Sequence, residues 1–365
     1  MRHRRRAANR TVSWVIGPVE VASIVANFAR AIPDAYSVSL APHRFYDFAY
    51  DFQIGAARGD TLRSLFVAPW EFGRLAAHAR GFAYVGSAGF LLTGVDDREW
   101  EFAFLRRHGV RLACVFTGSD IRSPVLMRQF QEQTGLETIT TYLDQVSPVF
   151  ATAAYDGQRA RIAAVADRHA DVIFNAAVDQ LSYLTSGTEP FPYFYPDDDI
   201  LTSDVKHFAA GPRIVVHAPS SPIIKGTQVV RAAIQRLRSE GYEFEYRELV
   251  AVPHDEVIRS LRDAHIVLNE FYAFVPGVFG VEAMANGCAL LTRADELIET
   301  DLPMGSNSAW VVTTAADIYA NVRQLLDEPD RIATQAAAGL AWVREHATVS
   351  ASGARVRGVL DGIGR

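Results

Sequence analysis

A loop rich in small hydroxyl side chains, with one lysine, lies between an apolar run at 213–218 and a helical pattern. This loop, HAPSSPIIKGT (217–227), contains Ser220, Ser221, Lys225, Gly226 and Thr227. The amides and the positive dipole end at a helix start favour an anion, and a lysine beside them adds a full charge. We therefore expect Lys225 to stabilise a diphosphate, with hydrogen bonds from the three hydroxyls. On composition alone, an ordinary surface lysine near a turn is the alternative.

One carboxylate stands out in a second loop and helix, NEFYAFVPGVFGVEAMANG (269–287), where Glu282 has apolar or small neighbours. Carboxylates are seldom buried without compensation, so we expect Glu282 on the wall of a binding cleft. A carboxylate there can accept hydrogen bonds from two adjacent hydroxyls. The alternative is a salt bridge to an arginine of a neighbouring helix.

Together the two loops resemble the retaining glycosyltransferases of family 4, which have the two-Rossmann fold called the B type. In that family a lysine-glycine pair opens the first helix of the donor domain, and an E-x7-E loop and helix comes later. The segments IKGT and VEAMANG match these features in type, order and separation. The resemblance implies that Lys225 meets the diphosphate of a nucleotide-sugar donor and that Glu282 binds its ribose hydroxyls. It also implies that the amides beside Gly277, such as that of Val278, lie near the phosphates.

Two positions depart from the family pattern. Phe274 stands where the first glutamate of E-x7-E belongs, and Ser220 replaces the usual arginine five residues before the lysine. The first glutamate normally touches the hexose, so these changes indicate either altered sugar preference or lost activity. Glu270, four residues earlier, is the carboxylate that can reach the sugar instead.

A third loop, FTGSDIRSP (116–124), follows a strand of the first half and resembles the acceptor-domain cleft loops of these enzymes. Gly118, Ser119, Asp120 and Arg122 are therefore the predicted acceptor residues. Asp120 is expected to hydrogen-bond a sugar hydroxyl, as a candidate catalytic residue beside Lys225, and Arg122 to meet an anionic group. An Asx-type turn with a solvated arginine is the alternative.

A weaker candidate is the segment VAVPHDE (250–256). The backbone near Val252 and the ring of His254 are expected to flank the nucleobase of the donor. The alternative is an exposed histidine at a helix start.

Two α/β units are needed to position these loops. From 213 to 291, short apolar runs alternate with helical patterns, as in repeated βαβ units. The first half repeats this pattern less clearly, and the stretch 185–204, rich in Pro, Asp, Ser and Thr, has neither helical nor strand period. The expected strands lie at 11–17, 36–40, 81–86, 111–116, 171–175, 213–218, 242–249, 264–268 and 288–292.

The predicted fold class is α/β, with two Rossmann-like βαβ domains facing a central cleft, because open α/β sheets bind ligands beyond their strand carboxyl ends. We assign an N-terminal acceptor domain to 1–205, including a basic disordered arm at 1–10. A C-terminal donor nucleotide-sugar domain is assigned to 206–345, and a C-terminal helix to 346–365. The stretch 185–204 is expected to be the interdomain connection.

The composition limits the class of protein. The chain has 365 residues, 49% of them apolar and 21% charged, which is typical of a globular protein with about two domains. Its net charge of −6, with dispersed basic residues, argues against nucleic-acid partners. The five arginines of MRHRRRAANR are either a weak peripheral contact with anionic lipid or a solvated tail.

The expected location is the cytoplasm. The arginines of residues 1–10 suggest an additional peripheral association with a membrane. Cys114 and Cys288 lie in apolar runs and are expected to be buried, inert thiols in a reducing compartment. No window approaches the ~18 apolar residues of a membrane-spanning helix.

The predicted function is transfer of a hexosyl group from a UDP- or GDP-sugar to an acceptor hydroxyl with retention of anomeric configuration. The acceptor is expected to be a sugar, a lipid-linked molecule or another small molecule. No cofactor or metal is expected, because the D-x-D within PDDDI (196–200) falls in the connection. The alternatives are a catalytically silent sugar-nucleotide or glycan-binding module and, more distantly, a sugar-nucleotide epimerase of the same fold.

Overall fold

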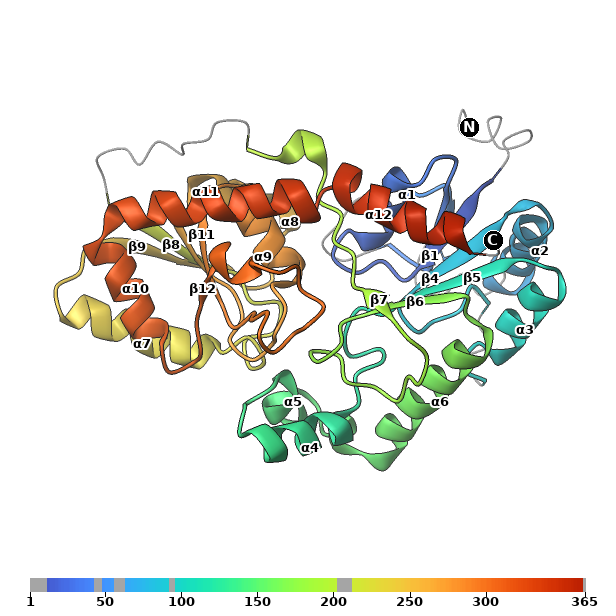
Figure 1. Cartoon of the computed structure of the whole chain (residues 1–365), viewed down its shortest axis with the longest axis horizontal. Coiled ribbons are helices and arrows are strands. Elements are labelled where there is room, and N and C mark those ends of the chain that lie inside the picture. The colour runs from blue at the N-terminus through green and yellow to red at the C-terminus, as the bar shows by residue number, and fades with distance from the viewer. Residues whose placement is uncertain (1–11, 43–47, 56–62, 92–95, 202–211, 364–365) are drawn as a thin grey trace.

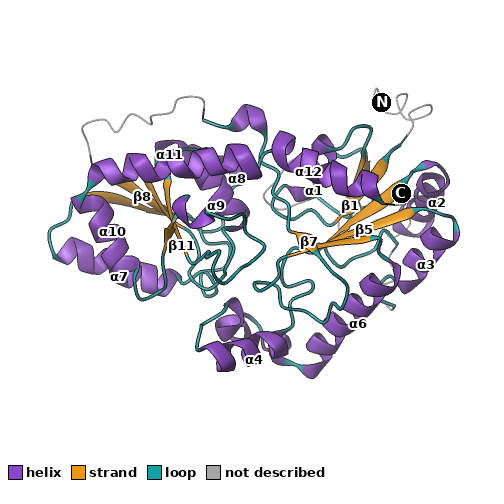
Figure 2. Cartoon of the chain, viewed as in Figure 1, coloured by secondary structure: helices purple, strands orange, loops and turns teal. Residues whose placement is uncertain are grey.

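The computed structural model describes residues 12–42, 48–55, 63–91, 96–201 and 212–363. These residues form two parallel sheets, each flanked by helices, and the predicted pair of Rossmann-like domains is confirmed (Figures 1 and 2). The basic arm at 1–10 lies outside the described residues, as do 202–211, which include the predicted domain boundary.

The N-terminal sheet has seven strands in the order β3-β2-β1-β4-β5-β6-β7. The central strands are buried on both faces, which explains why they are continuous apolar runs in the sequence. The strands are β1 (Trp14–Pro18), β2 (Tyr36–Ser39), β3 (Phe52–Gln53), β4 (Gly81–Val85), β5 (Arg111–Val115), β6 (Val172–Asn175) and β7 (Glu189–Pro190).

Helices cover both faces of this sheet. Helices α2 (Ala68–His78), α3 (Glu99–Arg107) and α6 (Ala153–His169) pack on one face. Helix α1 (Ile24–Ala31) packs on the other. Helices α4 (Pro124–Thr134) and α5 (Leu143–Val146) project toward the C-terminal domain (Figure 1).

The C-terminal sheet has five strands in the order β12-β11-β10-β8-β9. These are β8 (Arg213–His217), β9 (Phe244–Glu248), β10 (Ile266–Leu268), β11 (Ala289–Thr292) and β12 (Val311–Val312). The helices are α7 (Thr227–Ser239), α8 (His254–Asp263), α9 (Gly277–Ala285), α10 (Ile318–Asp327) and α11 (Pro329–His346). Helices α7 and α10 cover one face, and α8, α9 and α11 the other.

The expectation that 185–204 has no regular structure is wrong for its first part. Residues Glu189 and Pro190 form β7, which pairs in parallel with β6 at the edge of the N-terminal sheet. Proline is tolerated on an edge strand because its missing N–H does not interrupt a ladder on the outer side. The connection itself begins after β7 and bonds to the C-terminal region, where Tyr195 N–H donates to Ala347 O at 2.7 Å.

The C-terminal helix α12 (Val349–Gly362) returns to the N-terminal domain and packs on α1. A β-carbon at Gly353 would lie 2.9 Å from the Ala31 β-carbon, so the glycine permits this close approach. Arg80 and Asp361 add an ion pair at 2.7 Å. Both Cys114 and Cys288 are buried, as predicted.

Over the residues that the structure describes, no helix is both long and apolar enough to cross a bilayer.

Candidate functional site

The loops that follow the strands of the two sheets meet between the domains. Phe274, in the loop after β10, donates its backbone N–H to Asp179 Oδ1 of the loop after β6 at 2.8 Å. The Phe274 ring also packs against the Phe130 ring of α4, with 5.9 Å between centroids. The carboxyl ends of the two sheets therefore face each other, as expected for ligand sites of α/β proteins.

Lys225 lies in the loop between β8 and α7, and its ammonium group forms an ion pair with the carboxylate of Glu270, which follows β10. The Lys225 side chain is 20% exposed, whereas that of Glu270 is 5% exposed. Burial raises the pKa of Glu270, and the charge and hydrogen bond of Lys225 oppose that rise. The predicted phosphate-binding lysine thus has an internal counter-ion that sequence patterns did not reveal.

Glu270 lies directly beneath the start of α9. Gly277 has a positive φ of 63°, and a β-carbon there would lie 2.9 Å from Glu270 Oε1. Only glycine fits both constraints without strain. Lys225, Glu270 and the first turn of α9, with Gly277 and Val278, are therefore gathered at one edge of the sheet.

Glu282 lies one and a half turns further along α9 and accepts a hydrogen bond from His254 Nε2 at 2.7 Å. The alternative of an arginine partner for Glu282 is therefore wrong. His254 does stand at a helix start, the first residue of α8, but with 25% of its side chain exposed it is half-buried rather than exposed. Burial lowers the pKa of His254, but the hydrogen bond and charge of Glu282 outweigh it, so the pKa lies above its ordinary value.

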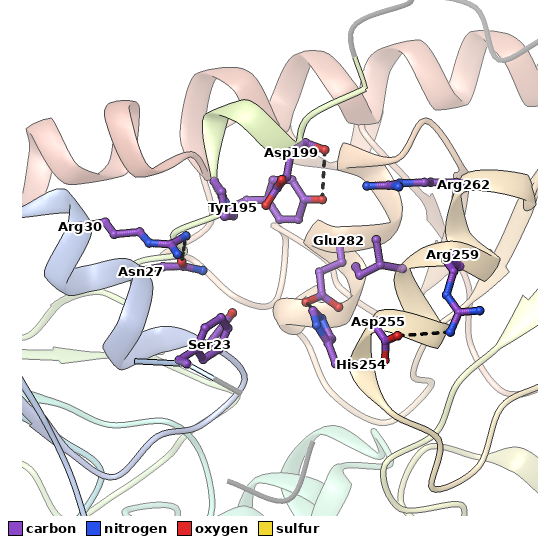
Figure 3. A pocket seen from close by; sticks show the side chains of 13 residues that line it. Ser23, Asn27, Arg30, Tyr195, Asp199, His254, Asp255, Arg259, Arg262 and Glu282 are labelled. Atoms are coloured by element: carbon purple, nitrogen blue, oxygen red, sulfur yellow. Dashed lines mark hydrogen bonds and ion pairs between the residues drawn. The ribbon is translucent and has the colours of Figure 1, made fainter. Parts of the chain in front are cut away.

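His254 and Glu282 line a cavity of about 490 Å³ between the domains (Figure 3). Asn27 and Arg30 of α1 line the wall formed by the N-terminal domain, and Arg262 of α8 lines the wall formed by the C-terminal domain. A volume of this size suits a small-molecule ligand. The mixture of guanidinium, carboxylate, imidazole and amide groups suits a polar ligand with several hydroxyls or a charge.

The hydroxyls of the lysine loop are placed differently from one another. Thr227 is buried, and its hydroxyl lies 2.9 Å from His217 Nε2. Because His217 Nδ1 bonds the Leu268 carbonyl oxygen at 2.7 Å, Nε2 is the acceptor, and the Thr227 proton is directed to His217. The expectation that Thr227 donates a hydrogen bond to a phosphate is therefore wrong in this structure. Of the two serines, Ser220 is exposed and Ser221 is half-buried.

The acceptor-loop residues mostly organise their own loop. Both carboxylate oxygens of Asp120 accept the N–H of Thr117, three residues earlier, at 3.0 and 3.1 Å. This bond differs from the Asx turn of the alternative, in which the bonded N–H lies two residues after the aspartate. The Ser119 carbonyl oxygen accepts hydrogen bonds from Tyr155 and Arg159, both at 2.6 Å. Gly118 has a φ of 140°, a conformation that favours glycine, and its neighbourhood includes the Arg122 guanidinium.

Arg122 is buried and bonds Asp179 Oδ2 at 2.5 Å, so the alternative of a solvated arginine is wrong. Asp179 therefore connects Arg122 to the Phe274 amide across the interface between the domains. Phe274, in place of the family's glutamate, is fully buried, and the Arg293 guanidinium lies over its ring at 5.4 Å. Val252 is half-buried at the entry to α8.

Sequence reasoning missed Asp179 and Glu299, which connect the domains. The Glu299 carboxylate accepts the backbone N–H groups of Ala177, Val178 and Asp179 at 2.9, 2.9 and 2.7 Å. Burial raises the pKa of Glu299 to about 6. Asp179 lies in the loop after β6, and Glu299 lies in the loop after β11. A search for polar residues in the loops that follow strands, which selected the other candidates, would also have found these two.

Within the described ranges, no group of three or more His, Cys, Asp or Glu side chains has an arrangement that could hold a metal ion.

Comparison with known proteins agrees with this geometry. Residues 199–356, the C-terminal domain with part of α12, match the family described as glycosyl transferase-like. Sucrose-phosphate synthase from Thermosynechococcus elongatus has a similar structure over 96% of this chain and 98% of its own, with a TM-score of 0.57 and 13% identity. WaaG, a glycosyltransferase involved in lipopolysaccharide biosynthesis, is similar over 96% of this chain and 100% of its own, with a TM-score of 0.52 and 12% identity. No curated protein sequence matches the chain.

The two sheets and the cleft between them define the B-type glycosyltransferase fold. The resemblance to the group 1 glycosyltransferases, predicted from IKGT and VEAMANG, is confirmed by the family match over the C-terminal domain and by the fold of the whole chain.

Proposed function

We propose that this chain transfers a hexosyl group from a UDP- or GDP-sugar to an acceptor hydroxyl, with retention of anomeric configuration. The observation that carries the proposal is the position of Glu282 on the wall of the interdomain cavity, with its partner His254 at 2.7 Å. A carboxylate so oriented can accept hydrogen bonds from the two ribose hydroxyls of the nucleotide. The cavity of about 490 Å³ has room for a nucleoside.

In this proposal the diphosphate lies beside Lys225 and the start of α9. Departure of the nucleoside diphosphate builds negative charge, and a preorganised ammonium group and helix amides stabilise that charge in the transition state. Lys225 is bonded to Glu270, so binding of the donor would divide its hydrogen bonds between Glu270 and a phosphate oxygen. Neither a protein nucleophile nor a metal ion is required for this role, and the donor is a substrate rather than a cofactor.

Glu270 is also the candidate for contact with the hexose. Its buried carboxylate lies beside Gly277 at the start of α9, and Glu270 precedes by four residues Phe274, which stands at the position of the family's first glutamate. Asp120 remains the acceptor-side candidate, although its carboxylate bonds the Thr117 amide. The acceptor in this proposal is a sugar, a lipid-linked molecule or another small molecule with a free hydroxyl.

A second candidate function is a catalytically silent module that binds sugar nucleotides or glycans. Phe274 favours it, because a buried aromatic ring occupies the position of the family's sugar-binding glutamate. The neutralisation of Lys225 by Glu270 also favours it, since a paired lysine attracts a diphosphate less strongly.

Nucleotide release from a panel of UDP- and GDP-hexoses, measured with and without simple sugar acceptors, separates the two functions. A transferase releases nucleotide faster with an acceptor present, and NMR of the product reports its anomeric configuration. Lys225→Met should abolish that release and weaken UDP or GDP binding more than binding of uridine or guanosine. Saturable nucleotide binding without release from any donor supports the silent module, and release of free sugar without an acceptor indicates an epimerase-type reaction.

A further inference from the structure

The two domains are in contact on the side of the cleft that lies away from their covalent connections. The chain crosses between the domains after β7 and again between α11 and α12. These crossings lie side by side, because Tyr195 N–H donates to Ala347 O at 2.7 Å and Val349 N–H donates to Tyr195 O at 2.8 Å. Helices α4 and α5 reach toward the C-terminal domain at the opposite edge of the molecule (Figure 1). Without contacts on that second side, the domains could open about the crossings.

Glu299 of the C-terminal domain makes the first of these contacts. Its carboxylate accepts three consecutive backbone N–H groups, those of Ala177, Val178 and Asp179 in the loop after β6, at 2.9, 2.9 and 2.7 Å. Successive amides that point to one spot form a concave anion site. The anion that occupies this site is a side chain of the other domain. Glu299 is fully buried, so its loss would leave these amides without their acceptor.

Asp179 makes the second contact, in the reverse direction. It belongs to the N-terminal domain, and its Oδ1 accepts the Phe274 N–H of the C-terminal domain at 2.8 Å. Its Oδ2 accepts a hydrogen bond from Arg122 of its own domain at 2.5 Å, which holds the carboxylate in place. Each domain therefore supplies a buried carboxylate to backbone N–H groups of the other, and hydrogen bonds to ionised groups are the stronger kind.

Aromatic rings cover the same loops. The Phe274 ring packs against Phe130 of α4, with 5.9 Å between centroids. The Tyr272 ring packs against Tyr142, directly before α5, with 4.8 Å between centroids. Hydrogen bonds that are shielded from water in this way are stronger than exposed ones.

We propose that Asp179 and Glu299 form an interdomain latch, which holds the two domains at one separation through protein groups alone. Asp179 bonds the predicted acceptor loop through Arg122, and it bonds the loop that carries Glu270 through Phe274. The latch therefore fixes the distance between the two predicted substrate sites. Opening the cleft requires both carboxylates to leave their N–H partners.

The latch does not depend on the proposed transfer reaction. Only the assignment of its two loops to an acceptor and a donor rests on that function. The separation of the domains can be measured without any nucleotide. A negative result in that measurement would contradict the latch and not the proposed function, whereas a donor panel without nucleotide release would contradict the proposed function and not the latch.

The test is a distance measurement by pulsed double electron–electron resonance between one spin label in each domain. Ala164→Cys of α6 and Ala232→Cys of α7 are suitable label positions, because both alanines are exposed on helices. The native Cys114 and Cys288 are buried, so the labels should react with the introduced thiols. The latch predicts one narrow distance distribution for the full chain with its native Asp179 and Glu299.

Glu299→Gln and Asp179→Asn should each add a population at a longer distance, because each keeps the size of the side chain and removes a charged acceptor. In Glu299→Gln, hydrogen–deuterium exchange of the amides 177–179 should become about tenfold faster or more. Glu296→Gln is the matched control. Its carboxylate lies in the same loop as that of Glu299 but accepts the Asn307 N–H of its own domain at 2.9 Å, so both measurements should equal those of the wild type.

Two results would overturn the proposal. The first is a wild-type distance distribution as broad as that of the variants, because the latch would then not hold the domains. The second is an unchanged narrow distribution in folded Glu299→Gln and Asp179→Asn. If Glu299→Gln does not fold, Glu299→Asp replaces it, since it keeps the charge and shortens the reach. That variant should also show the longer distance, and an unchanged distance would count equally against the latch.

Discussion

Substitution of Glu270 by glutamine should increase the affinity of the protein for nucleoside diphosphates. In the present arrangement Glu270 neutralises Lys225, so an incoming diphosphate meets a lysine already bonded to a carboxylate. Glu270→Gln keeps the size of the side chain and leaves Lys225 with an unbalanced positive charge. Because the Lys225 side chain is 20% exposed, water can solvate the ammonium group, and the fold should persist.

The size of the gain follows from the charge that the substitution removes. A carboxylate and a phosphate about 7 Å apart repel each other by about 2.4 kcal/mol at an effective dielectric constant of about 20. Solvent around Lys225 reduces this to about 1–2 kcal/mol, which corresponds to about a 5- to 30-fold tighter complex. Nucleosides carry no phosphate, so their affinity should change less than about twofold.

Isothermal titration of UDP, GDP, uridine and guanosine measures both effects. Glu240→Gln, which removes an exposed carboxylate on the far end of α7, is the control and should change neither affinity. Adding Lys225→Met to Glu270→Gln should abolish the gain. A folded Glu270→Gln variant with unchanged or weaker diphosphate binding would refute the assignment of Lys225 to the diphosphate.

Three further predictions concern the same cleft. Glu282→Gln should leave the fold intact and lower kcat/KM for the donor about 30- to 1000-fold, equivalent to about 2–4 kcal/mol, and unchanged steady-state kinetics would contradict the ribose assignment. Because the pKa of Glu299 is raised from 4.5 to about 6, its carboxyl group stays protonated to a higher pH in the folded protein than in the unfolded chain. As the pH rises from 4.5 to 6, the free energy of unfolding should thus fall by about 1 kcal/mol, and denaturant titrations of Glu299→Gln should lack this contribution. Gly277→Ala combines a left-handed φ with a clash against Glu270, so it should lower the melting temperature and weaken nucleotide binding, whereas an unchanged titration would show that the start of α9 is not at the phosphates.

The sequence predicted four of the five strands of the C-terminal sheet, because three of them are apolar runs and β9 alternates aromatic with charged residues; the two-residue strand β12 was missed. Strands at 213–218, 264–268 and 288–292 match β8, β10 and β11 within two residues. The N-terminal sheet was less legible at its edges. The edge strand β7 contains a glutamate and a proline, which carry no strand pattern, and its pairing with β6 depends on tertiary contacts.

Residues of the candidate site were predictable where the chemistry of one side chain, such as a carboxylate among apolar neighbours, limits the role that the residue can have. Glu282 among small and apolar neighbours needed a partner, and the sequence indicated a cleft wall without identifying His254. The pairing of Lys225 with Glu270, the use of Thr227 by His217 and the link from Arg122 to Asp179 are contacts between distant segments. Local periodicity carries no information on such contacts, because they arise only when the two sheets and their loops are assembled.

The central claim is that the cleft binds a nucleotide sugar with its diphosphate at Lys225 and its ribose at Glu282. A crystal structure of the protein in complex with UDP or GDP tests this claim most directly. We expect phosphate oxygens within hydrogen-bond distance of Lys225 Nζ and the amides beside Gly277, and ribose hydroxyls within hydrogen-bond distance of the Glu282 carboxylate. A nucleotide bound elsewhere, or bound in this cleft with Glu282 still directed only to His254, would contradict it.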